Sequence, residues 1–157
     1  IMDYDFEWDS QKANINLEPI RVHNFTKLNK VCDELVVCNI GIPSQELHAI
    51  DDQPTNFYML GTMGLASSIG FGLALAQPKT VISIDGDGSV LTNLGNLPTI
   101  ANNPTDNYIL MIIDNGSYGS TGDQPTYAGK KTSLTAVAPG VFRIRSSTAS
   151  LSSSTIH

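Results

Sequence analysis

Hydrophobic residues gather in short, almost uninterrupted runs along the chain, and a glycine or a polar residue ends most of these runs. The clearest runs are 80–85 (TVISID) and 107–114 (NYILMIID), followed by 34–40 (ELVVCNI) and 56–60 (NFYML). Continuous apolar runs of about four to eight residues, rich in Val and Ile, are typical of strands buried on both faces of a parallel sheet. The pattern predicts four such strands, and VFRIR at 141–145 is a candidate for one more.

Helices are predicted between these strands. A serine N-cap begins a short helix at 44–50, a helix rich in small residues spans 63–76 and stops before a proline, and 91–103 is the third. Residues 20–32 also place apolar side chains loosely on one helical face. Alternating strands and helices predict an α/β fold, in which a parallel sheet carries helices on both faces.

Composition divides the chain into three parts. The 157 residues, of which 41% are hydrophobic and 15% charged, have the balance of one globular domain. Residues 1–19 are acidic and lack clear periodicity, so they are treated as an N-terminal extension without assigned function. Residues 20–145 form the predicted domain. Residues 146–157 are a Ser-rich tail that looks frayed or truncated. The chain begins with Ile, which suggests a fragment, a processed chain or a cloning artefact.

Charge and hydropathy exclude several classes of partner. The net charge of −6 and the pI near 4.8 argue against nucleic acid, whose phosphates such a surface repels. No apolar stretch is long enough for a membrane span, and no signal pattern begins the chain, so a cytoplasmic protein is expected. Cys32 and Cys38 lack clustered His or Cys neighbours and are expected to be reduced core residues.

Two polar segments follow the two strongest predicted strands, GDGS at 86–89 and DNGS at 114–117. The carboxyl ends of parallel strands meet at one edge of a sheet, so these segments are expected to lie together. Mg²⁺ prefers hard oxygen ligands, which Asp87, the amide oxygen of Asn115 and the backbone carbonyl of Ser117 offer. Glycines beside the aspartate also bring backbone N–H groups close to a phosphate. GDG alone is more typical of a simple strand-to-helix turn, and it is the pairing with DNGS that favours a ligand site.

Together, the two segments resemble the cofactor motif of the thiamine-diphosphate-dependent 2-oxoacid decarboxylases, within their pyrophosphate-binding domain. The resemblance implies that Asp87, Asn115 and Ser117 ligate magnesium. It also implies that thiamine diphosphate meets backbone groups around the first segment, at Gly86, Gly88 and Ser89. The motif of this family commonly ends in two asparagines, whereas this chain has Asp114 first, which is expected to stay outside the metal shell.

A third segment, GTMG at 61–64, resembles the loop with which this family grips the aminopyrimidine of the cofactor. The resemblance implies that the Gly61 carbonyl accepts a hydrogen bond from the 4′-amino group. It makes Met63 the apolar wedge that holds the cofactor bent, so that the amino group approaches the reactive thiazolium carbon. A lone methionine is otherwise more typical of core packing.

Over residues 20–145 the chain resembles, more narrowly, the β subunits of sulfopyruvate decarboxylases, and phosphonopyruvate decarboxylases are similar over the same region. This resemblance implies diphosphate contacts in CNIGIPS and a substrate-facing loop, at Asn39, Gly41, Ser44, Ser120 and Thr121. Without it, CNIGIPS is typical of a strand that ends in a Gly-Pro turn with a Ser N-cap.

The resemblance also implies a partner. The pyrimidine-binding (PYR) domain, with the glutamate that protonates N1′ of the cofactor, has no room in this chain. A hetero-oligomer with a PYR-domain α subunit is therefore expected, and no turnover by the chain alone. The implied substrate is a small anionic 2-oxoacid, sulfopyruvate, which yields sulfoacetaldehyde and CO₂ in coenzyme M biosynthesis. Members of this family continue past the tail with a strand and a helix, so an exposed sheet edge is expected.

Two alternatives remain open from the sequence. The loop DNGSYGSTGDQ also resembles the β subunit of 2-oxoacid:ferredoxin oxidoreductases, although two cysteines cannot supply the four ligands of an iron–sulfur cluster. A non-catalytic phosphate- or nucleotide-binding module uses similar loops. Several side chains could be functional or merely structural. Lys130 and Lys131 could attract an anionic substrate or simply be solvated, and Tyr118 and Tyr127 could close the loop over the site or only pack there. His23, His48 and His157 are expected to be surface or packing residues.

Overall fold

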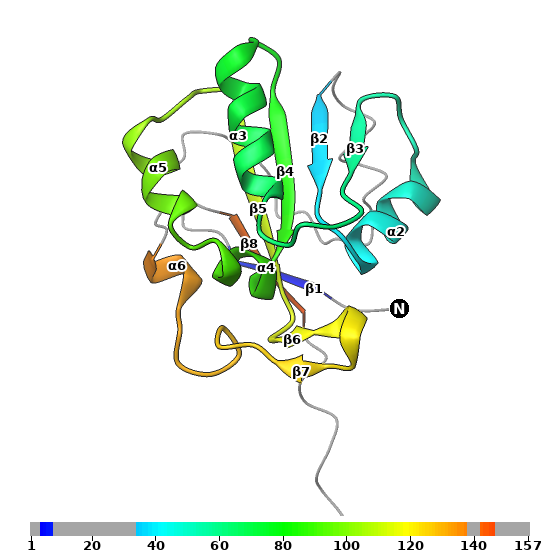
Figure 1. Cartoon of the computed structure of the whole chain (residues 1–157), viewed down its shortest axis with the longest axis vertical. Coiled ribbons are helices and arrows are strands. Elements are labelled where there is room, and N and C mark those ends of the chain that lie inside the picture. Colours follow the sequence, from blue (N-terminus) through cyan, green and yellow to red (C-terminus); the bar gives the residue numbers. More distant parts are fainter. Residues whose placement is uncertain (1–3, 8–33, 138–141, 147–157) are drawn as a thin grey trace, which may run out of the picture.

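The computed structural model describes residues 4–7, 34–137 and 142–146. A six-stranded sheet forms its centre, in the order β1-β8-β5-β4-β2-β3 (Figure 1). The strands of this sheet are β1 (Tyr4–Glu7), β2 (Leu35–Cys38), β3 (Asn56–Tyr58), β4 (Val81–Gly86), β5 (Tyr108–Asp114) and β8 (Phe142–Ser146). Neighbouring strands from β3 to β8 run parallel, and β1 joins β8 in the antiparallel direction.

Helices flank the sheet and connect its strands. They are α2 (Ile42–Ile50), α3 (Ala66–Ala76), α4 (Asp87–Thr92), α5 (Asn96–Asn102) and α6 (Leu134–Val137). A separate small hairpin lies below the sheet in Figure 1, formed by β6 (Ser117–Tyr118), the 3₁₀ turn η1 (Gly119–Thr121) and β7 (Gln124–Pro125).

The two faces of the sheet carry different parts of the core. On one face, Val36 and Ile84 pack with Leu47 of α2. On the other, Val37 and Val81 pack against α3. Because adjacent residues of a strand point to opposite faces, continuous apolar strands are what a sheet covered on both sides requires. The predicted α/β architecture, a parallel sheet with helices on both faces, is confirmed.

Helix α3 lies unusually close to the sheet. A Cβ added at Gly70 would collide with the Oγ of Ser83, and the hydroxyl of Ser83 donates to the carbonyl of Ala66 at 3.1 Å. The hydroxyl of Tyr108 donates to the carbonyl of Ser67 at 2.9 Å on the same helix. The small residues of this segment therefore let a helix backbone approach strand side chains, where larger residues would hold it away.

Five predicted strands are confirmed: β2, β3 and β5 are shorter than predicted, and β4 and β8 are shifted by one residue. Residues 1–19 hold a strand that the sequence did not predict. Strand β1 pairs with β8 in the register Phe6↔Ile144. The expectation that the sheet ends in an exposed edge at β8 is therefore wrong, because β1 covers that edge. A four-residue strand containing two acidic residues leaves no apolar run long enough to detect. The helix predicted at 20–32 and the tail beyond Ser146 lie outside the described residues.

Some predicted helix boundaries are wrong. Helix α2 begins at Ile42, and its N-cap is Gly41, which has no side chain that could cap it. Ser44, the predicted cap, lies inside the helix, and its hydroxyl donates to the carbonyl of Asn39 at 2.5 Å. The helix predicted at 63–76 begins at Ala66. GDGS is not a loop, since Asp87 is already the first residue of α4, and the helix predicted at 91–103 is divided between α4 and α5.

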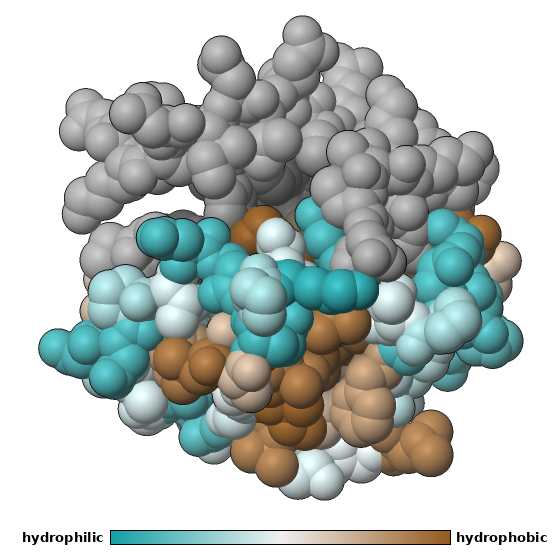
Figure 2. Space-filling model, turned by 90° about the horizontal axis from the view of Figure 1, so that it is seen from above, coloured by the Kyte–Doolittle hydropathy of each residue, from teal (hydrophilic) through white to brown (hydrophobic). Residues whose placement is uncertain are grey.

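Figure 2 views the molecule from above, from the end opposite to the hairpin in Figure 1. Brown apolar residues form a patch near the middle of this view and smaller areas beside it, with teal and white residues between them. The most exposed large apolar side chain is that of Leu60, at 95%. Within the part of the chain that the structure describes, no helix has the length and apolar character needed to cross a membrane.

Candidate active site at the carboxyl ends of the strands

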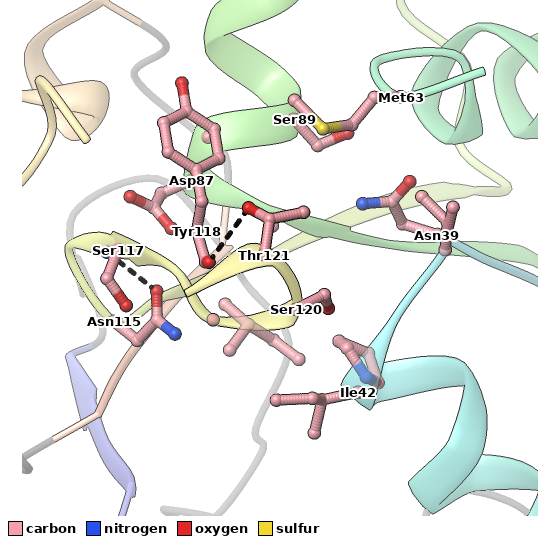
Figure 3. A pocket seen from close by; sticks show the side chains of 16 residues that line it. Asn39, Ile42, Met63, Asp87, Ser89, Asn115, Ser117, Tyr118, Ser120 and Thr121 are labelled. Carbon is pink, nitrogen blue, oxygen red and sulfur yellow. Dashed lines mark hydrogen bonds between the residues drawn. The ribbon is translucent and has the colours of Figure 1, made fainter. Parts of the chain in front are cut away.

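One pocket opens where β2, β4 and β5 end (Figure 3). About 710 Å³ of space lies within it, counting its open mouth. Its lining comes from four segments: Asn39, Ile40, Ile42 and Pro43; Met63; Gly86, Asp87, Gly88 and Ser89; Ile113, Asn115, Ser117, Tyr118, Gly119, Ser120 and Thr121. Ten of the thirteen predicted site residues line this pocket, and Gly41, Ser44 and Gly61 do not.

Asp87 is the only carboxylate among the described residues that line the pocket. It is 2% exposed, and it follows β4 directly as the first residue of α4. Burial raises the pKa of the Asp87 carboxyl, and the negative charge of Asp114 raises it further. The hydroxyl of Thr126 donates to Oδ2 of Asp87 and opposes this rise in pKa. A buried carboxylate without a neighbouring cation in the lining is a strong candidate for a metal ligand.

Asn115 and Ser117 lie on the turn that follows β5. Oδ1 of Asn115 accepts a hydrogen bond from the N–H of Ser117 at 3.0 Å, drawn in Figure 3, and Gly116 between them has a φ of +69°. Oδ1 of the buried Asp114 accepts from the N–H of Gly116 at 3.1 Å. These two local hydrogen bonds hold the turn in place. The turn also needs glycine at position 116, because a residue with a Cβ rarely adopts a positive φ. They hold Asn115 on the pocket wall, and Asp114 stays outside the lining.

The loop that carries Met63 is bonded to helix α4. Its Gly64 N–H donates to Oγ of Ser89 at 2.7 Å, and Nδ2 of Asn93 donates to the Gly64 carbonyl at 2.8 Å. Oγ1 of Thr92 donates to the Met63 carbonyl at 3.3 Å. Met63 is 43% exposed and lines the pocket across from Asp87 in Figure 3. One short helix thus positions both the carboxylate and the apolar side chain.

Beneath this helix lies a second buried carboxyl, that of Asp85. Burial raises the pKa of Asp85 to about 6, although hydrogen bonds from Ser89 and from the Gly86 N–H oppose the rise. Since the hydroxyl of Ser89 also accepts from Gly64, a single serine connects the strand end with the Met63 loop. Ser89 is therefore held from both sides.

The third wall belongs to the end of β2. Asn39 is 4% exposed, lines the pocket, and has a side-chain Oδ1 without a hydrogen-bond partner among the described residues. Gly41 has a φ of +101°, and an added Cβ there would lie 2.5 Å from Oγ of Ser120. Ser44 bonds the Asn39 carbonyl. Gly41 and Ser44 therefore shape the wall from behind rather than lining it.

Several residues of the site were not singled out from the sequence. They are Ile40, Ile42, Pro43, Ile113 and Gly119 in the lining, and Thr126 behind Asp87. The apolar ones flank the polar motifs, so their position beside a strand end was their only signal. Thr126 had none, because it reaches Asp87 only through the return of the chain after β7.

The residues that the sequence left open divide clearly. The ring of Tyr118 lies against Gly88, where an added Cβ would be 2.7 Å from Cδ1, and it lines the pocket. Tyr127 is 71% exposed, with Nζ of Lys130 5.5 Å from its ring centroid. Neither Lys130 nor Lys131 lines the pocket. Tyr118 is thus the tyrosine that belongs to the site.

The remaining candidates lie elsewhere. Cys38 is a free, buried cysteine, as predicted. His48 is a surface residue, as predicted, and its Nε2 is 3.5 Å from Oδ2 of Asp52. Cys32, His23 and His157 lie outside the described residues. Among residues 34–137 and the two described strands at the ends, no group of three or more His, Cys, Asp and Glu is placed to hold a metal.

Comparison with known proteins identifies the family. Residues 42–144, well over half of the chain, match the family described as thiamine pyrophosphate enzyme, C-terminal TPP binding domain. The chain belongs to the thiamine pyrophosphate enzymes. The match begins at α2 and ends within β8, so it contains most of the sheet and almost all of the pocket lining.

Three relatives of this thiamine pyrophosphate enzyme illustrate its similarities. The sulfopyruvate decarboxylase subunit beta of Methanocaldococcus jannaschii is 61% identical over 68% of this chain and 57% of the relative. The sulfopyruvate decarboxylase of Methanosarcina acetivorans is 50% identical over 71% of this chain and 30% of its own length. The phosphonopyruvate decarboxylase of Streptomyces viridochromogenes is 45% identical over 60% and 24% respectively. The chain spans about half the length of the subunit beta relatives that it matches.

Proposed function

We propose that this chain binds thiamine diphosphate and Mg²⁺ in the pocket and forms the β-subunit part of a cytoplasmic 2-oxoacid decarboxylase that acts on sulfopyruvate. The observation that carries the proposal is the meeting of Asp87 and Asn115 in one pocket. They follow neighbouring parallel strands, which pair in the register Gly86↔Ile113. Ligands of open α/β sheets bind at this edge.

The donor set fits magnesium. The carboxylate of Asp87 is buried, and no Lys, Arg or His stands among the described residues that line the pocket, so a divalent cation would neutralise it. Asn115 would add its amide oxygen and Ser117 its backbone carbonyl. One carboxylate with neutral oxygen donors is typical of Mg²⁺ shared with substrate phosphates, whereas zinc prefers His and Cys.

The rest of the pocket fits the two ends of thiamine diphosphate. Backbone groups at Gly86, Gly88 and Ser89 would hold the diphosphate, together with Asn39, which lines the pocket and can donate through its side-chain Nδ2. Gly41 and Ser44 would support that contact. At the other end Met63 would hold the bend and the carbonyl of Gly61 would accept from the 4′-amino group.

When bound, the cofactor supplies the electron sink into which the 2-oxoacid loses CO₂. The residues of this chain would bind it, orient it and exclude water from it. Ile40, Ile42 and Ile113 give the pocket the apolar wall for the last task. A low-polarity wall strengthens the electrostatic interactions inside a site.

Substrate and partner are supported by the relatives. A relative 61% identical carries the name sulfopyruvate decarboxylase subunit beta, and the word subunit supports a second chain. We propose that this second chain is a PYR-domain α subunit that supplies the glutamate for N1′, and that the hetero-oligomer makes sulfoacetaldehyde and CO₂ for coenzyme M biosynthesis. Ser120 and Thr121 would face the substrate. Phosphonopyruvate is the alternative substrate, because relatives at 45–46% identity are named for it.

Calorimetry tests the cofactor. We expect thiamine diphosphate to bind in the presence of Mg²⁺ and ATP with Mg²⁺ to give no heat above the blank. Asp87→Ala should abolish the magnesium-dependent binding and leave the fold intact, and Asp106→Ala, an exposed aspartate outside the pocket, should bind like the unaltered chain. Binding of ATP but not thiamine diphosphate would overturn the proposal. An absorption spectrum with the broad brown bands of an iron–sulfur cluster would favour the ferredoxin oxidoreductase instead.

The substrate is tested with the partner present. We expect the reconstituted hetero-oligomer to release CO₂ from sulfopyruvate with a higher kcat/KM than from phosphonopyruvate, and neither chain to turn over alone. The reverse preference would assign the phosphonate as substrate.

A further inference from the structure

Thr126 joins two segments of the site that are far apart in the chain. It follows β7 and is 1% exposed. Its hydroxyl donates to Oδ2 of Asp87, a residue that precedes it by 39 positions in the chain. Its backbone N–H donates to the carbonyl of Gly116 at 2.9 Å. One residue therefore contacts both the end of β4 and the turn after β5.

The direction of the hydroxyl bond follows from its second partner. Oγ1 of Thr126 lies 3.4 Å from the backbone N of Gly129, which donates to it. An N–H can only donate, so this bond occupies a lone pair of the hydroxyl and leaves its single proton for Asp87. Oδ2 of Asp87 is therefore the acceptor of this bond.

The segment around Thr126 fits closely against the turn after β5. A Cβ added at Gly129 would lie 2.9 Å from the carbonyl oxygen of Gly116 and 3.1 Å from its Cα, so only glycine permits this approach. The methyl Cγ2 of Thr126 lies 3.1 Å from the Cβ position of Gly88. The contact is therefore a packed joint, with little freedom for either side to shift alone.

We propose that Thr126 is a positioning residue for the metal site. It fixes the rotation of the Asp87 carboxylate and ties it, through Gly116, to the turn that presents Asn115 and Ser117. The inference rests on the proposed function, because it assigns these residues to Mg²⁺. Groups that orient metal ligands typically change metal affinity by about 10–100-fold when they are removed.

The test compares the hydroxyl with isosteric replacements in the full chain. The measured quantity is the Mg²⁺ concentration that gives half-maximal binding of thiamine diphosphate, determined by calorimetry. We expect Thr126→Val to raise this concentration by about 10–100-fold. Thr126→Ser keeps the donor and should restore a value near that of the unaltered chain. Thr99→Val, on the exposed surface of α5, is the matched control and should change nothing.

A second readout separates positioning from simple structural support. A residue that only stabilised the fold would lower the melting temperature without cofactor, but the folded molecules would retain the original Mg²⁺ requirement. An unchanged requirement in Thr126→Val would therefore overturn the inference alone. Absence of binding by the unaltered chain would overturn the proposed function and the inference with it.

The comparison stays decisive if the valine variant does not fold. Thr126→Ser and Thr126→Cys then form the test pair, because the two side chains have similar shapes and a thiol is a weak donor. We expect the cysteine variant to need about 10-fold more Mg²⁺ than the serine variant. Equal requirements in this pair would contradict the role of the hydroxyl.

Discussion

At the scale of single residues, a buried polar group informs us mainly through the partners that it has or lacks. The carboxylate of Asp87 has a hydroxyl donor but no cation among the described lining residues, which is an unfavourable state for a buried charge. Such groups are retained where a ligand completes them, so the pocket is shaped for a charged guest rather than for its own stability.

Cys38 gives a prediction about pH. Burial raises the pKa of its thiol to about 12, with a hydrogen bond from Ser44 opposing and the charge of Asp85 adding to the rise. In the unfolded chain the thiol ionises near its usual 9.0. As the pH rises above 9, the thiol therefore loses its proton in the unfolded chain before it does so in the folded protein. The contribution of the protonated Cys38 thiol to stability is complete below pH 9 and is lost as the pH rises toward 12.

The measurement is urea unfolding at several alkaline pH values, for the unaltered chain and for Cys38→Ala. We expect the free energy of unfolding to fall more steeply above pH 9 for the unaltered chain than for Cys38→Ala. In addition, a thiol reagent at pH 8 should label Cys38, located by peptide mapping, only after unfolding. Rapid labelling of the folded protein at that position would contradict the burial.

Sequence reasoning succeeded for residues whose role is local. Asp87, Asn115 and Met63 each stand in a short motif whose chemistry is legible within a few positions, and all three line the pocket. It failed for Thr126, because a lone threonine becomes important only when the chain folds back onto it. Ser44 shows a third case: it was predicted to cap α2 but lies inside that helix, and its hydroxyl donates to the strand-end carbonyl of Asn39 instead.

At the scale of elements, helix α3 illustrates how small residues determine a distance. Its serines, alanines and glycines place the helix backbone near Ser83 and Tyr108. The sequence predicted a helix here but not its close approach, because the partner surface belongs to strands that follow later in the chain. The first four residues of α4, 87–90, were not predicted as helix, because a helix of six residues is too short to show periodicity.

Two glycines of α3 provide a matched pair of substitutions. Gly70→Ala would drive a methyl group into Ser83 and should lower the free energy of unfolding by about 1–3 kcal/mol. Gly72→Ala, on the same helix, meets nothing within 4 Å and should raise it by about 0.5–1 kcal/mol. Urea denaturation measures both. Similar effects from the two substitutions would show that helix propensity, not contact with the sheet, governs this helix.

At the scale of the whole molecule, the order of strands determines where chemistry collects. Strands β2, β4 and β5 stand next to one another in the sheet, although helices and loops separate them along the chain. Their carboxyl ends therefore form one continuous rim, from which the polar motifs face a common pocket. The parallel α/β architecture followed from the sequence because its strands are continuously apolar. The place of β1 did not, since pairing with β8 needs no apolar pattern.

Removal of β1 tests its contribution to the sheet. Deletion of residues 1–7 would expose the backbone donors and acceptors of β8, an open edge that favours pairing between molecules. We expect a lower melting temperature, by about 2–4 °C for each kcal/mol lost, and concentration-dependent association in sedimentation. Asp106→Ala, at an exposed position outside β1 and β8, serves as the control. An unchanged melting temperature after the deletion would show that β1 adds nothing to the sheet.

The pairing of β1 with β8 also has a consequence for synthesis on the ribosome. Strand β8 begins at Phe142, 135 residues after β1 ends at Glu7 (142 − 7 = 135). At about 5–20 residues per second, strand β1 waits about 7–27 s for β8 to be synthesised. During that interval β1 has no partner strand, and its short sequence with two acidic residues is well suited to stay solvated until β8 is made.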